Sequence, residues 1–126
     1  MKSNPTSGFS LLELMVALAI MAILAGLAIS IYRPFMNKTV CSKVEVVVHQ
    51  TMLKAVKELT ETGTVPSGNA TTALGIVLPD DVASVVVSGS GTAASPITVN
   101  GTAVGNKCPK GTIYVLKESD TKGTWK

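Results

Sequence analysis

An acidic residue stands inside the most apolar part of this 126-residue chain. Between Phe9 and Ile31 the only charged side chain is Glu13. An ionised carboxylate inside lipid costs about 2.5–3.5 kcal/mol on insertion scales and is tolerated mainly when it is paired. The apolar segment offers no Lys, Arg or His before Arg33. Glu13 therefore predicts an ion pair with an α-amine that proteolysis would create just upstream.

The residues before the apolar run offer a site for that proteolysis. Met1–Ser7 is polar and carries one basic residue, Lys2, and Gly8 precedes Phe9. As a helix, Phe9–Ile31 would be about 35 Å long, enough to cross a hydrocarbon core of about 30 Å. A secretory signal would have a shorter apolar region, and a soluble core helix would show a polar face. A plain membrane anchor is the remaining alternative.

Gly8-Phe9-Ser10-Leu11-Leu12-Glu13-Leu14-Met15-Val16 resembles the class III signal of type IV pilins and of the pseudopilins of type II secretion. The resemblance implies cleavage after Gly8 by a prepilin peptidase and N-methylation of Phe9. It also implies that Glu13 pairs with the amine of Phe9 in a neighbouring subunit, and that the apolar helices form a filament core. The chain would lie in the inner membrane until the pilus assembly machinery there builds it into a surface filament.

Many pilins have a helix-bending Pro where this chain has Ser30. Pro34 follows four residues later, so a bend is expected near Ser30 to Pro34. Beyond it, apolar residues step by three or four positions and occupy an arc of about 60° on a helix. They are Cys41, Val44, Val48, Met52, Ala55 and Leu59. We expect one helix over residues 9–61, stopped by Gly63 and Pro66.

The rest of the chain predicts a small antiparallel sheet. Residues 64–83 have a loop composition with a short turn at 72–76. Residues 82–87 and 97–99 read as a hairpin, 112–117 as a third strand and 123–125 as a fourth. Such a sheet must bury one face, and the helix stripe is its available partner. The prediction is an α+β protein: a leader (1–8), a hydrophobic helix (9–34) and a globular head (35–126).

The chain has two cysteines, Cys41 on the helix stripe and Cys108 in the loop before the third strand. If the N-terminal segment exports the chain, an oxidising compartment favours a disulfide between helix and sheet. Two free thiols, or pairing between subunits, are the alternatives.

Other residue patterns predict neither an enzyme nor a cofactor. His49, the only histidine, has no accompanying nucleophile motif and is expected at the edge of the helix stripe. The cysteines and histidine lack zinc spacing, and the acidic residues are too sparse for a calcium loop, so no metal is expected. Five lysines crowd the last twenty residues: Lys107, Lys110, Lys117, Lys122 and Lys126. They are expected to be solvated, with contact to DNA or another anionic surface as the alternative.

These observations predict a structural filament subunit. A type IV pilus serving adhesion, twitching motility or DNA uptake is favoured, because the Gly/Thr/Ser-rich loops resemble pilins and an Asp-rich calcium segment is lacking. A pseudopilin of a type II secretion system carries the same signal and is the second hypothesis. A membrane-anchored binding module is the third, and it would leave Glu13 unexplained.

Overall fold

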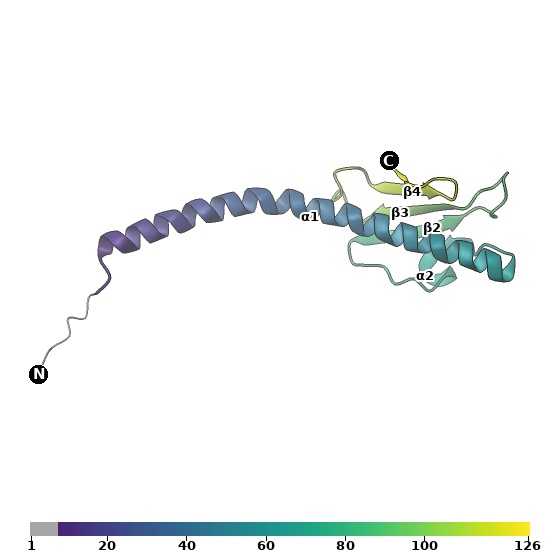
Figure 1. Cartoon of the computed structure of the whole chain (residues 1–126), viewed down its shortest axis with the longest axis horizontal. Coiled ribbons are helices and arrows are strands. Elements are labelled where there is room, and N and C mark those ends of the chain that lie inside the picture. The colour runs from purple at the N-terminus through teal and green to yellow at the C-terminus, as the bar shows by residue number, and fades with distance from the viewer. Residues whose placement is uncertain (1–7) are drawn as a thin grey trace, which may run out of the picture. The chain divides into compact units, whose positions relative to one another are not determined.

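The computed structural model describes residues Gly8–Lys126, so the predicted leader lies outside the described residues except for Gly8. The chain divides between Phe35 and Met36 into two units. Helix α1, Leu11–Thr62, runs from the first unit into the second. The second unit also contains a small sheet and a one-turn helix (Figure 1).

Helix α1 begins and ends close to the predicted bounds of 9 and 61. Its first backbone hydrogen bond runs from Leu14 N to Ser10 O (3.2 Å), and Gly63 N donates to Leu59 O (2.9 Å) at its end. Gly63 has φ of +76°, a conformation that glycine adopts without a Cβ clash and that commonly ends a helix. Pro34 lies inside α1. The helix thus continues past the proline, and a bend there stays a prediction.

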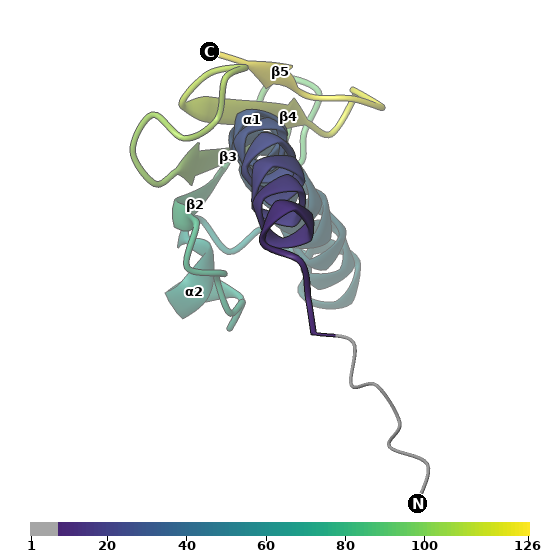
Figure 2. The same ribbon diagram turned by 90° about the vertical axis from the view of Figure 1, so that its left-hand side faces the viewer.

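Five antiparallel strands form one sheet in the order β1-β2-β3-β4-β5. The three long strands are β2 (Val82–Ser88), β3 (Thr98–Ala103) and β4 (Ile113–Lys117). Two-residue strands stand at the edges, β1 (Gly68–Asn69) and β5 (Thr124–Trp125). The predicted hairpin and the two later strands are therefore confirmed. Figure 2 shows β5 and helix α2 (Ala70–Ala73) at opposite edges of the sheet.

The core of the head lies between the sheet and the second half of α1, as the stripe predicted (Figure 1). Five of the six stripe residues are buried and Leu59 is partly buried: Cys41, Val44, Val48, Met52 and Ala55 are the buried ones. Opposite them lie Val85, Val87, Val99, Tyr114 and Leu116 from the long strands. The α+β fold is therefore correct, with a helix on one face of an antiparallel sheet.

Two local predictions were wrong. Residues 64–83 are not all loop, because β1 and α2 lie there, and α2 starts before the predicted turn at 72–76. Asn69 sets that start: its side chain accepts hydrogen bonds from the backbone N and the hydroxyl of Thr71. Strand β3 also extends beyond 97–99, through Asn100 and Gly101, which have low strand propensity. Tertiary packing overrides propensity there, since Gly101 packs so closely on α1 that a Cβ would lie 2.3 Å from Cγ2 of Val48.

Candidate functional site

The first unit presents an apolar helical surface without cover from the rest of the described chain. Every Leu, Ile, Met, Val and Phe side chain from Phe9 to Ile31 is more than half exposed. Contiguous apolar surface of this extent marks contact with a membrane or with other proteins. By length and composition, α1 can cross a membrane. This segment therefore needs lipid or other protein surfaces around it.

Glu13 lies in the first turn of α1. The first backbone N–H groups of a helix have no partner within the helix and carry a partial positive charge, which favours a carboxylate at this end. Phe9, which is 81% exposed, is four residues upstream. The structure thus places the predicted acid and the predicted new amino terminus near the same exposed helix end, together with Gly8, which is also exposed.

The sequence at this end of the chain matches a known protein-family motif. Residues 3–29 match the prokaryotic N-terminal methylation motif. The chain carries a type IV pilin or pseudopilin signal. No curated protein and no solved structure matches the chain. The signal indicates a structural subunit, and with the apolar helix it is consistent with membrane anchoring before assembly into a surface filament.

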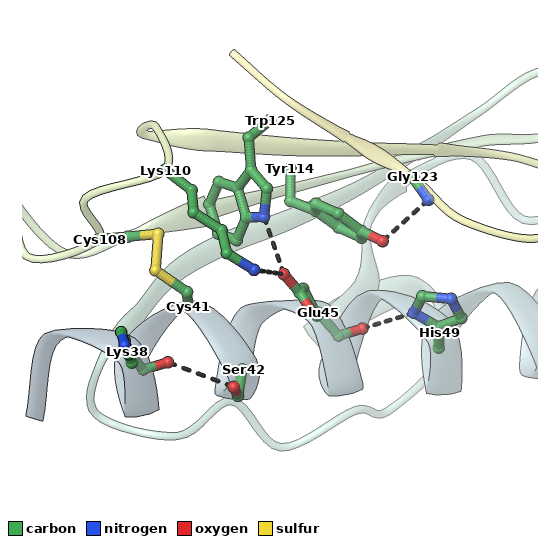
Figure 3. Close-up of polar contacts among 10 residues, drawn as sticks. All are labelled: Lys38, Cys41, Ser42, Glu45, His49, Cys108, Lys110, Tyr114, Gly123 and Trp125. Atoms are coloured by element: carbon green, nitrogen blue, oxygen red, sulfur yellow. Dashed lines mark hydrogen bonds and ion pairs between the residues drawn. A yellow bond between two sulfur atoms is a disulfide. The ribbon is translucent and has the colours of Figure 1, made fainter. Parts of the chain in front are cut away.

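In the head, α1 is joined covalently to the loop that precedes β4. Cys41 and Cys108 form a disulfide, with Cα atoms 5.1 Å apart, and both residues are buried (Figure 3). The bond closes a long stretch of chain, since 67 positions separate the two cysteines. In the chain-entropy model such a loop stabilises the folded head by about 4 kcal/mol. The expected disulfide is therefore present, and it holds the 104–112 loop on the helix.

One helical turn after Cys41, the side chain of Glu45 binds two groups from other elements (Figure 3). Its Oε1 accepts hydrogen bonds from Trp125 Nε1 of β5 (2.9 Å) and Lys110 Nζ (3.1 Å). The pKa of Glu45 lies below its ordinary value: burial raises it, but these two hydrogen bonds and the charges of Lys110 and Lys122 more than offset burial. Glu45 is therefore ionised at neutral pH and ties α1 to two later segments.

A second carboxylate ties α1 to the start of β2. Asp81 accepts a hydrogen bond from Lys43 Nζ on α1 (2.5 Å) and lies 3.7 Å from Lys107 Nζ. The hydrogen bond from Lys43 is the largest influence on the pKa of Asp81, which lies below its ordinary value. Sequence reasoning missed both Asp81 and Glu45, although Glu45 follows Cys41 by four residues and so lies on the same side of the helix.

The predicted cluster of lysines is less basic than its count suggests. All five lysines are exposed, but Lys107 and Lys110 pair with Asp81 and Glu45. Nucleic-acid binding at this edge stays a prediction. His49 is half-buried at the boundary of the core, where its Nδ1 is 2.8 Å from the carbonyl oxygen of Glu45. Within residues 8–126, three or more metal-binding side chains do not come together.

Proposed function

We propose that this chain is a structural subunit of a type IV pilus. A prepilin peptidase hydrolyses the Gly8–Phe9 peptide bond, which frees the α-amine of Phe9, and that amine is then methylated. The hydrophobic helix holds the subunit in the inner membrane until the assembly machinery transfers it into a surface filament. The observation that carries the proposal is the methylation motif over 3–29 on an exposed apolar helix whose single acid is Glu13.

The charge of Glu13 favours transfer of the subunit from lipid into the filament. In lipid, the carboxylate lacks a basic side chain nearby in the sequence and is destabilising by about 2.5–3.5 kcal/mol. In a filament, it pairs with the α-amine of Phe9 from a neighbouring subunit, while the apolar side chains pack on other helices. Moving from lipid to the filament therefore replaces an unpaired charge by a paired one. Only subunits in the correct axial register bring the two groups together, so the pair also selects the register.

The first experiment is the intact mass of the protein recovered from membranes and from the cell surface, under non-reducing conditions, with sequencing of the N-terminal peptide. We expect a chain that starts at N-methylated Phe9 and contains the Cys41–Cys108 bond. A chain that still starts at Met1, or one cut near Ala28, would contradict the proposal and indicate an anchor or a secreted protein.

Assembly is tested by replacing Glu13. Glu13→Ala should insert and be processed but should assemble poorly, whereas Glu13→Asp, which keeps the charge, should retain more assembly. Glu61→Ala is the matched control, because Glu61 is an exposed acid of the head whose contact, with Lys57 at 3.6 Å, is a surface pair of small energetic weight. Normal fibres from Glu13→Ala would remove Glu13 from the mechanism.

A pseudopilin of a type II secretion system is the second candidate, since the same motif serves both classes. Electron microscopy of cells lacking the gene separates the two. Loss of long surface fibres supports the pilus, with its roles in adhesion, twitching motility or DNA uptake. Intact fibres together with failed protein export would support the pseudopilin.

A further inference from the structure

The last four described residues, Gly123–Lys126, form a short strap across the edge of the sheet, here named the 123–126 strap. Its strand β5 pairs with β4 at two positions, Tyr114 with Trp125 and Val115 with Thr124. Lys126 adds backbone hydrogen bonds to Thr112 and Ile113. Edge pairing this short is marginal by itself. The strap therefore depends on what its side chains bind.

Gly123 and Trp125 make the contacts that bring the strap to the core, and Gly123 N donates a hydrogen bond to the hydroxyl of the buried Tyr114 (2.8 Å). The ring of Trp125 lies 5.1 Å from the ring of Tyr114, and its Nε1 donates to the carboxylate of Glu45 on α1 (Figure 3). Hydrogen bonds to an ionised acceptor are about twice as strong as those between neutral groups. The carboxylate of Glu45 thus connects the strap to the helix across the sheet edge.

The loop before β4 does not depend on that carboxylate in the same way. Lys110 also binds Glu45, but Cys108, two residues earlier, is covalently bound to Cys41. Loss of the charge on Glu45 would leave this loop attached to the helix. The main core, built from α1 and the three long strands, is likewise independent of Glu45. The 123–126 strap is the segment that loses its bond to α1, while its contacts with β4, including the hydrogen bond from Gly123 N to the hydroxyl of Tyr114 (2.8 Å), do not involve Glu45.

We propose that Glu45 is an acid-sensitive latch for the 123–126 strap. When ionised, it holds Trp125 against the helix; when protonated, it releases the Trp125 side chain from the helix while the rest of the head stays folded. The inference is independent of the filament, because it concerns contacts within one head.

The charged and titratable groups around Glu45 come from three places. Lys110 approaches from the β3–β4 loop, Lys122 from the turn before β5, and His49 from the next turn of α1. Both lysines favour the ionised carboxylate. A group whose pKa is lowered by folding stabilises the fold above its ordinary pKa, and this contribution is lost as the pH falls through the lowered value. Release is therefore expected below pH 4.5, the ordinary pKa of this carboxyl group.

Trp125 is the only tryptophan of the chain, so its fluorescence reports the strap directly. The full chain in detergent micelles is titrated from pH 7 to pH 3 while tryptophan emission, acrylamide quenching and far-ultraviolet circular dichroism are recorded. We expect a reversible shift of emission to longer wavelength and stronger quenching below pH 4.5, with the circular dichroism unchanged. Loss of the dichroism together with the fluorescence change would show global acid unfolding and overturn the latch.

Substitutions identify the titrating group. Glu45→Gln should abolish the acid transition of Trp125 fluorescence. Asp81→Asn and His49→Gln should retain it, since Asp81 binds α1 away from the strap and His49 contacts the backbone carbonyl of Glu45 and the ring of Tyr114 rather than the carboxylate. A transition that persists in Glu45→Gln, or that disappears in either control, would overturn the proposal.

Gly123→Ala opens the strap without changing a titratable group. A Cβ at this position would lie 2.5 Å from the carbonyl oxygen of Val115 and 2.6 Å from Cζ of Tyr114, so the strap must move away. This variant should show at pH 7 the emission and quenching that the unmodified chain shows in acid. Emission at pH 7 identical to that of the unmodified chain would contradict the assignment of the acid signal to the strap.

Discussion

Helix and sheet approach closely at Gly101, which predicts a specific coupling with Val48. A Cβ at Gly101 would lie 2.3 Å from Cγ2 of Val48 and 3.0 Å from Cγ1 of Val44. Val44 and Val48 are fully buried, so neither side chain can swing into solvent. Gly101→Ala therefore forces overpacking of the core, for which a destabilisation of about 2 kcal/mol is typical.

Val48→Ala provides the second arm of a double-mutant cycle. Removing two carbon atoms from a fully buried side chain should destabilise the head by about 2–3 kcal/mol, from lost transfer free energy and the cavity left behind. In the double variant, the methyl group introduced at position 101 enters the space vacated by Val48. We expect a combined loss at least about 1 kcal/mol smaller than the sum of the single losses.

The assay is thermal unfolding of the full chain in detergent micelles, under non-reducing conditions, followed by circular dichroism of the head. For a domain of this size each kcal/mol corresponds to a change of about 4–8 °C in Tm. Thr102→Ala is the control, because Thr102 neighbours Gly101 but belongs to the less buried face of β3. Additive losses in the double variant would refute the reasoning that the Gly101–Val48 contact limits the helix–sheet distance.

Two further predictions concern the bonds that tie α1 to the rest of the head. Replacing both cysteines, Cys41→Ala with Cys108→Ala, should lower the free energy of unfolding by about 4 kcal/mol. Thermal unfolding under non-reducing conditions should then show a large fall in Tm, and an unchanged Tm would contradict the prediction. The carboxylate of Asp81, whose pKa is lowered chiefly by the hydrogen bond from Lys43, stabilises the head above its ordinary pKa of 3.8 and loses this effect as the pH falls further. The difference in urea midpoint between the unmodified chain and Asp81→Asn should therefore be present at pH 7 and shrink at pH 3, and an equal difference at both pH values would argue against this role.

Regular spacing of apolar residues and runs of β-branched residues predicted the larger elements of the head. The step of three or four residues from Cys41 to Leu59 predicted the buried face of α1, because burial against a sheet selects one side of a helix. The β-branched residues of β2 and β4 predicted their strands. Asn100 and Gly101 were missed because their place in β3 follows from the close approach of α1 and not from their own propensity.

The polar contacts of the head were beyond sequence reasoning for a different reason. Glu45 binds Trp125 across 80 positions of chain, and Asp81 binds Lys43 across 38. Local patterns carry no information on such pairs until the sheet register is known. The disulfide was easier to predict, since two cysteines allow only one intramolecular bond. The N-terminal signal was easier still to predict, because the residues that define it lie within one short segment.

The two segments of helix α1 have different surroundings. In the proposed pathway, this difference explains how assembly can leave the head unchanged. From Met36 onward, the apolar stripe of α1 is covered by the protein's own sheet and secured by the disulfide and two carboxylates. From Phe9 to Ile31, the apolar side chains remain exposed, and in the proposed pathway lipid and then neighbouring subunits cover them. In the proposed pathway, the head therefore folds before assembly, and only the first segment exchanges one set of neighbours for another. The charge on Glu13 then distinguishes the two surroundings, since lipid leaves it unpaired and a processed neighbour pairs it.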